Sequence, residues 1–116
     1  MAKRETFGQF LRREREAQHI TLRKFAEAVK MSPTYLSKVE RDELPPPAEE
    51  KVKAIARALL LDPDELLGRA GRVAADLDLI IQQRPKKLAI FLRSSRALSE
   101  ADLDEILSIV ERRGRS

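Results

Sequence analysis

Four polar side chains recur at helical spacing near the middle of the chain and offer its clearest chemistry. They are Thr34, Ser37, Lys38 and Arg41, at i, i+3, i+4 and i+7. This face combines hydroxyl groups with two cations and has no carboxylate, which phosphates would repel. Short polar residues let a helix approach base edges in a major groove, and a lysine ammonium donates to guanine acceptors. The pattern predicts a helix that binds double-stranded DNA, with an ordinary solvated helix face as the open alternative.

Two more cations lie in the first turn of the preceding helix, where Arg23 and Lys24 follow Thr21. Cations at a helix N-terminus oppose the helix dipole, at a cost of roughly 0.3–1 kcal/mol each. A bound phosphate reverses this penalty, because the free N–H groups of the first turn form an anion site. These residues therefore indicate contact with a phosphate backbone.

No other group of residues is patterned for catalysis or metal binding. The absence of Cys excludes a thiol nucleophile, a disulfide and a cysteine metal site. His19 is the only histidine, and a solvated loop position outweighs a metal or general-base role. The carboxylates from Glu100 onward fill the first turns of a capped helix, where acids are stabilising anyway. Gly68 and Gly71 lack the spacing of a phosphate-binding loop. We expect no enzyme activity, no cofactor and no metal.

Apolar residues recur at helical spacing along the chain, which predicts an all-α fold. Five helices are expected in a first domain over residues 4–70, at about 6–18, 22–29, 33–40, 48–59 and 63–70. Thr21, Ser32 and Asp62 are their N-caps, and a proline-rich connector spans 44–47. A helical extension over 71–116 contains two or three more helices, one of which ends at Pro85.

The joint between the second and third helices is short. Only Lys30 and Met31 separate the apolar stripe that ends at Val29 from the cap Ser32. Helices joined so closely must cross steeply, which is the helix-turn-helix arrangement.

Two opposite charges lie on core-facing stripes of different helices. Arg15 follows Leu11 by four residues, and Glu40 follows Leu36 by four. This spacing predicts a partly buried ion pair between the first and third helices, with a structural role favoured over DNA contact.

Residues 10–67 resemble the Cro/lambda-repressor-like helix-turn-helix family, also called the xenobiotic-response-element type. The resemblance is carried by LRRERE (11–16), ITLRKFAEAV (20–29), SPTYLSKVER (32–41) and ARAL (56–59), in the family's order and spacing. It implies a five-helix DNA-binding domain, mostly of bacterial and phage repressors, that inserts its third helix in the major groove and generally binds as a dimer. It also implies the Arg15–Glu40 pair.

Carried over by position, the resemblance implies a base-facing group and a phosphate-facing group. The base-facing residues are Ser32, Pro33, Thr34, Ser37 and Lys38. The phosphate-facing residues are Thr21 and Arg41, to which we add Arg23, Lys24 and Tyr35, the last with packing at the core edge as its alternative. Two departures stand out. Lys30 occupies a turn position that is often glycine, and Pro33 cannot donate a hydrogen bond to a base.

The extension 71–116 carries apolar residues that it cannot bury by itself. They are Leu77, Ile80, Ile81, Phe91, Leu92, Leu103, Ile106, Leu107 and Val110. They must pack against the first domain, a second copy or another protein. We prefer a homodimer, which would place two recognition helices about one DNA turn, roughly 34 Å, apart on a near-palindromic operator. The alternative is an antitoxin-like or adaptor protein whose C-terminal helices bind a partner protein.

The composition is compatible with a DNA-binding protein but does not require one. The chain has 116 residues, of which 36% are charged, and a formal net charge of +4, which permits a polyanionic partner. Its longest apolar run, 88–92, is far shorter than the roughly 18 residues of a membrane span. The N-terminus lacks the pattern of a signal peptide. We expect a cytoplasmic transcriptional regulator, most simply a repressor.

Overall fold

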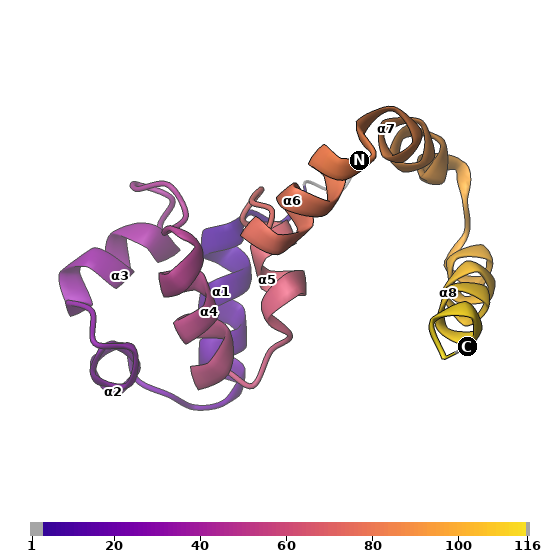
Figure 1. The fold of residues 1–116 in the computed structure, drawn as a ribbon. Coiled ribbons are helices and arrows are strands. Elements are labelled where there is room, and N and C mark those ends of the chain that lie inside the picture. Colours follow the sequence, from indigo (N-terminus) through magenta and orange to yellow (C-terminus); the bar gives the residue numbers. More distant parts are fainter. Residues whose placement is uncertain (1–3, 116) are drawn as a thin grey trace. The chain divides into compact units, whose positions relative to one another are not determined.

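The computed structural model describes residues 4–115, and its regular structure is helical (Figure 1). The elements are α1 (Phe7–Ala17), α2 (Leu22–Val29), α3 (Pro33–Glu40), α4 (Glu49–Ala58), α5 (Pro63–Arg69), α6 (Ala75–Gln83), α7 (Pro85–Ser94), the 3-10 turn η1 (Ser95–Ala97) and α8 (Glu100–Gly114). No strand occurs among the described residues, and the predicted helices are all present. The all-α prediction is confirmed.

The chain divides into two compact units, the first ending at Ala75 and the second beginning at Asp76. This division lies five residues after the predicted boundary between residues 70 and 71. Arg72 donates hydrogen bonds to the carbonyl oxygens of Pro46 and Pro47, both at 2.6 Å. Ala74 is buried in the core of the first unit. Residues 71–75 therefore belong with the first unit.

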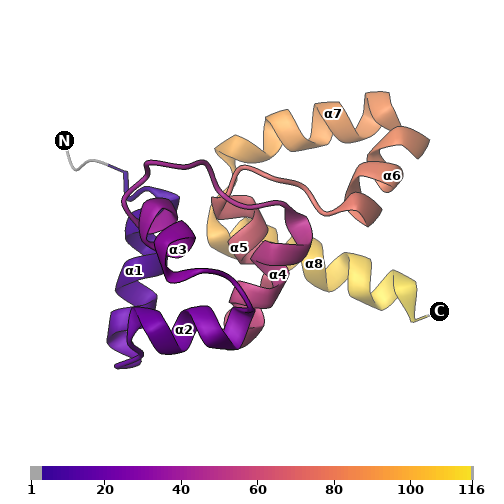
Figure 2. The same ribbon diagram turned by 90° about the vertical axis from the view of Figure 1, so that its left-hand side faces the viewer.

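The core of the first unit is built from the apolar stripes of α1 to α5 and the residue that follows α4. Its largest fully buried side chains are Leu11, Phe25, Leu36, Val39, Val52, Ile55, Leu59, Leu66 and Leu67. Burying a side chain of this size contributes roughly 1.5–3 kcal/mol. Within this core α3 packs against α1 and α2, and α4 packs against α2 and α5 (Figure 2). The third helix therefore rests on a rigid support.

Side-chain caps fix where the helices begin. Thr21, Ser32 and Asp62 accept hydrogen bonds from the backbone N–H three residues ahead, at 3.0–3.2 Å. Thr6 forms a reciprocal capping box with Gln9 at the start of α1, and Ser99 forms one with Asp102 at the start of α8. Each cap contributes typically about 1 kcal/mol to helix stability.

The second unit contains most of α6, with α7 and α8, and has no core of its own. Between Asp76 and Arg115 no described side chain is buried. None of the helices described over 4–115 combines the length and apolar character needed to cross a membrane.

Candidate nucleic-acid interface

The turn between α2 and α3 is closed by the backbone of Lys30, which adopts the left-handed conformation with φ 57° and ψ 44°. Its N–H donates to the carbonyl oxygen of Glu27 at 3.3 Å, and the N–H of Met31 donates to Ala26 at 3.0 Å. A left-handed residue with a Cβ costs about 1–2 kcal/mol, so this position is strained relative to glycine. Lys30, which stands where the family often has glycine, therefore lies at the turn that sets the angle between α2 and α3.

The face of α3 that carries the predicted base-facing residues is largely open to solvent. Ser32, Pro33, Thr34 and Lys38 are exposed, and Ser37 is half-buried. The opposite face is fully buried, with Leu36 at 0% and Val39 at 1% exposure. The helix thus presents hydroxyl groups and an ammonium outward while apolar packing fixes its back.

Tyr35 lies between these two faces. It is half-buried against the apolar core, and the ammonium of Lys51 lies 5.0 Å from the centroid of its ring. A cation over a tyrosine ring is attracted by the negative face of its π-system. The structure therefore places Tyr35 at the edge of the core, beside a cation of α4.

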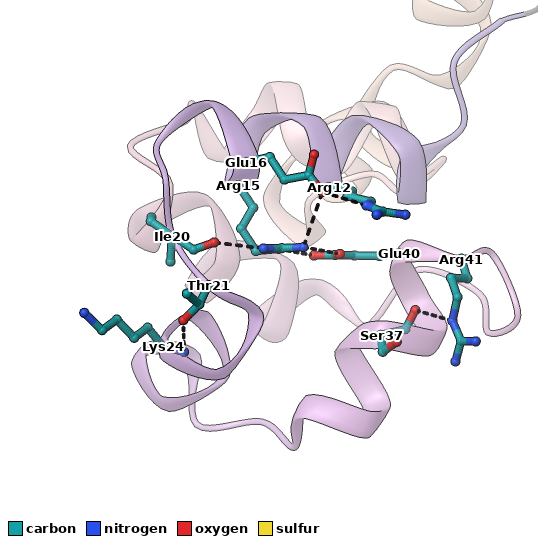
Figure 3. Close-up of polar contacts among 9 residues, drawn as sticks. All are labelled: Arg12, Arg15, Glu16, Ile20, Thr21, Lys24, Ser37, Glu40 and Arg41. Atoms are coloured by element: carbon teal, nitrogen blue, oxygen red, sulfur yellow. Dashed lines mark hydrogen bonds and ion pairs between the residues drawn. The ribbon is translucent and has the colours of Figure 1, made fainter.

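Arg15 and Glu40 form a bidentate ion pair beneath this surface (Figure 3). Nε of Arg15 donates to Oε2 of Glu40 at 2.8 Å, and Nη2 donates to Oε1 at 3.0 Å. Nη1 donates to the carbonyl oxygen of Ile20 at 2.8 Å. The hydrogen bonds that Arg15 donates to the Glu40 carboxylate raise the pKa of Arg15 by stabilising the cation. One guanidinium therefore joins α1, α3 and the loop that leads into α2.

A second polar contact, which the sequence analysis missed, fastens the end of α3 to the start of α1. Asp42 has a left-handed backbone with φ 61°. Its carboxylate accepts from the Thr6 hydroxyl at 2.7 Å and from the Gly8 N–H at 3.2 Å. A Cβ on Gly8 would lie 2.5 Å from the Val39 carbonyl oxygen, so only glycine fits. The sequence signal for this close contact was Gly8 itself, a glycine in the first turn of a helix.

Three of the predicted phosphate-facing residues, Thr21, Arg23 and Lys24, lie at the start of α2. Thr21 caps this helix through the N–H of Lys24 (Figure 3), while the side chains of Arg23 and Lys24 are exposed. The first-turn amides that the cap does not satisfy are the kind of donor that binds anions. These cations therefore flank a helix N-terminus.

A shallow pocket of about 300 Å³ lies where α1, α2 and α3 meet. It is lined by Arg12, Arg15, Leu22, Ser37, Glu40 and Arg41. Arg12, which the sequence analysis did not single out, brings a second exposed guanidinium to this pocket besides Arg41, while Arg15 is buried. Arg12 pairs with Glu16 at 2.8 Å and lowers the pKa of that carboxyl, and Arg41 pairs with Glu43 at 3.0 Å. Both pairs are more than half exposed, so a phosphate can compete for these guanidiniums at little cost.

A family model described as a helix-turn-helix domain matches residues 6–67, just over half of the chain. The chain belongs to the helix-turn-helix family. An HTH-type transcriptional regulator of Mycobacterium tuberculosis, itself uncharacterized, is 34% identical over 98 residues, which cover 76% of this chain and 69% of that protein. The family-model match together with the similarity to such regulators confirms the resemblance to the Cro- and lambda-repressor-like helix-turn-helix family.

The solved structures of two regulators are similar to this chain. ClgR, the clp gene regulator of Corynebacterium glutamicum, is 30% identical with a TM-score of 0.51, covering 81% of this chain and 94% of its own. SinR, a master regulator for biofilm formation solved in complex with DNA, is 24% identical with a TM-score of 0.50, covering 53% of this chain and 98% of its own. The likeness to SinR shows the shared fold.

The apolar residues predicted for a dimer or partner surface all lie in the second unit of this helix-turn-helix protein. Six of them are exposed by 41–59%, namely Leu77, Ile80, Phe91, Leu92, Leu107 and Val110. The other three, Ile81, Leu103 and Ile106, are half-buried. The sequence analysis missed Leu79, Ile90 and Ile109, which are exposed by 51–59% although they lie outside the predicted stripes.

Proposed function

We propose that this protein is a sequence-specific regulator that binds double-stranded DNA as a homodimer and represses transcription by occupying a promoter. The observation that carries the proposal is the face of α3. Thr34 and Lys38 are exposed on a helix whose back is fixed by Leu36 and Val39. A helix of this kind fits the major groove, where its outer side chains read base edges.

In this proposal Ser32, Pro33, Thr34, Ser37 and Lys38 face the bases. Lys38 donates to guanine acceptors, the hydroxyl of Thr34 donates or accepts, and Pro33 makes apolar contact with a thymine methyl group. Because Pro33 is exposed and offers no donor, direct reading of the sequence rests on Thr34 and Lys38.

The phosphate backbone is bound on the same side of the first unit. Thr21, Arg23 and Lys24 meet one phosphate at the start of α2, and Arg12 and Arg41 meet another at the pocket that they line. Such contacts fix the position of a protein on the duplex and make binding sensitive to salt.

Two copies bind together in this proposal, with their α3 helices in successive major grooves roughly 34 Å apart on a near-palindromic operator. The names of the relatives support a regulatory role: ClgR is a clp gene regulator, and the mycobacterial relative is an HTH-type transcriptional regulator. These relatives are regulators rather than enzymes, and we propose the same for this chain, acting on DNA in the cytoplasm.

The proposal is tested by fluorescence anisotropy with DNA from upstream of the protein's own gene and with a scrambled duplex, at several salt concentrations. We expect tight binding to the upstream DNA only, weakening steeply as salt rises. Equal binding to both duplexes would contradict sequence-specific binding at this promoter. No binding to either duplex at low salt would overturn the DNA-binding function.

Two variants separate base reading from backbone contact. Lys38→Ala should cost about 1–3 kcal/mol of binding to the preferred DNA and reduce discrimination against the scrambled duplex. Arg12→Ala should weaken binding to both duplexes similarly and lower the salt slope by about one. Lys86→Ala removes the same charge from the second unit and serves as the matched control, with binding unchanged.

A second candidate is an adaptor or antitoxin-like protein, favoured by the exposed apolar side chains of the second unit. Reversal of both Lys38 and Arg41 to Glu distinguishes the two functions. In a repressor this variant loses DNA binding while its thermal midpoint is nearly unchanged. In an adaptor it keeps its partner.

A further inference from the structure

The second unit contains two amphipathic helices whose apolar stripes are uncovered. Phe91 and Leu92 of α7 are exposed by 42% and 50%, and Leu107 and Val110 of α8 by 55% and 59%. Helices shorter than about 12–15 residues are marginal in water unless an apolar face is packed. The helices α7 and α8, with 10 and 15 residues, are at or below this length and are stabilised when a complementary surface covers their apolar stripes.

These two helices carry opposite charge. Between residues 79 and 99 the chain has five cations and no carboxylate: Arg84, Lys86, Lys87, Arg93 and Arg96. Between residues 100 and 111 it has five carboxylates and no cation: Glu100, Asp102, Asp104, Glu105 and Glu111. The change of sign falls at the start of α8. The helix α7 is thus basic, and α8 is acidic as far as Glu111 and ends with two cations, Arg112 and Arg113. The charges of α7 and of this acidic part of α8 are complementary.

Part of this charge lies along the edges of the stripes. On α7, Lys87 precedes Phe91 by four residues and flanks the stripe, and Arg84 is the N-cap residue just before the helix. Lys86 and Arg93 are seven residues apart on the opposite side of the same helix.

The helix α8 repeats this arrangement with acids. Asp104 precedes Leu107 by three residues and Glu111 follows it by four, so both flank the stripe of α8. A helix lying on α8 would therefore meet carboxylates at the edge of its apolar contact.

We propose that α7 of one copy docks against α8 of a second copy, and that the same contact repeats in reverse across a two-fold axis. Such an interface is self-complementary, with two equivalent seams that each pair a basic helix with an acidic one. The inference deepens the proposed function and rests on its homodimer. It names the surface that joins the two DNA-binding units.

The test is a charge exchange in the full-length chain. One variant reverses the basic edge, with Arg84→Glu and Lys87→Glu, and the other reverses the acidic edge, with Asp104→Lys and Glu111→Lys. Sedimentation equilibrium measures the dimer dissociation constant of each variant, of their equimolar mixture and of the parent. Far-UV circular dichroism checks that helix content is kept.

Each variant alone should dimerise roughly 10- to 100-fold more weakly than the parent, because both seams then juxtapose like charges. The mixture should form a one-to-one heterodimer with an affinity within roughly threefold of the parent's, since each seam regains opposite charges. A chain with all four substitutions should dimerise by itself. Lys86→Glu with Arg93→Glu changes the charge equally on the far side of α7 and should leave dimerisation unchanged.

Three results would overturn the proposal. The first is a parent that stays monomeric at about 100 µM, which would leave the stripes to another protein. The second is that one variant dimerises like the parent, which would show pairing of α7 with α7 or of α8 with α8. The third is that the mixture gives no heterodimer, as expected if α7 packs against α8 of its own chain.

The outcome is separable from that of the proposed function. Restored dimerisation in the mixture with no DNA binding by the parent would uphold this interface and overturn the DNA-binding function. DNA binding by the parent without restoration in the mixture would overturn this interface alone.

Discussion

Replacement of Arg15 or Glu40 by leucine is the sharpest test of how α3 is held in place. The two side chains are 9% and 6% exposed and joined by two hydrogen bonds of 2.8 and 3.0 Å. In Glu40→Leu the guanidinium stays in the protein and loses its carboxylate. In Arg15→Leu the carboxylate stays and loses both of its donors.

The size of the effect follows from these contacts. A hydrogen bond to a charged group contributes about 1.5–3 kcal/mol, so losing two of them costs roughly 3–5 kcal/mol, in the range known for broken buried pairs. Arg15 keeps its bond to the Ile20 carbonyl oxygen and a 3.9 Å contact with Glu16 in Glu40→Leu, which places that variant at the lower end. The double variant leaves no buried charge and should lie within about 1–2 kcal/mol of the parent.

The assay is a double-mutant cycle measured by urea or thermal unfolding. Each single variant should lower the thermal midpoint by at least about 12 °C, at roughly 4–8 °C per kcal/mol for a unit of this size. The double variant should recover most of this loss, which gives a coupling energy of about 4 kcal/mol or more. Single effects below about 1 kcal/mol that simply add would refute the reasoning, because they would mean that water solvates both charges.

Three further perturbations test other parts of the structure. Gly8→Ala should destabilise the first unit by about 1–3 kcal/mol in thermal unfolding, because its Cβ would meet backbone carbonyl oxygens. The matched Gly68→Ala, in an open helical position, should stabilise the first unit by up to about 1 kcal/mol. Equal effects of the two substitutions would contradict the close approach of backbone carbonyl oxygens to Gly8. Lys30→Gly should raise the free energy of unfolding by roughly 0.5–1 kcal/mol, because glycine adopts the left-handed conformation without strain. A loss of stability would show that contacts of the Lys30 side chain outweigh its backbone strain. Hydrogen bonds with the backbone amide and the hydroxyl of Ser99 lower the pKa of Asp102. The ionised Asp102 therefore stabilises the start of α8 at pH values above the ordinary carboxyl pKa, and this stabilisation is lost as the pH falls through the lowered pKa. Far-UV ellipticity should therefore fall below about pH 4, and less so in Asp102→Asn.

The helices were predictable from sequence because their signals are local. Apolar spacing identified the stripes, and caps such as Thr21 and Ser32 fixed the helix starts. The same spacing placed Arg15 and Glu40 on core-facing stripes, and two charges on such stripes have few stable arrangements other than a pair.

Contacts between distant residues were not predictable in this way. Asp42 binds Thr6 and Gly8 across 36 and 34 residues, and periodicity assigns a residue to a face without naming its partner. Arg12 was passed over for the same reason, because its role depends on a pocket shared with α2 and α3. The hydrogen bonds from Arg72 to the proline-rich connector likewise have no local signature in the sequence.

The contacts that fix α3 use none of the side chains proposed to read bases most directly. The turn at Lys30 sets where the helix begins, Glu40 ties its inner face to Arg15, and Asp42 fastens its end. Thr34 and Lys38 lie outside this set and are exposed, so substitutions there should alter DNA preference without loss of stability, since exposed changes are usually worth less than about 0.5 kcal/mol. A selection for new operators at these two positions, followed by thermal unfolding of each selected variant, tests this separation. Variants that gain a new preference only with a large loss of stability would show that reading and support are not independent.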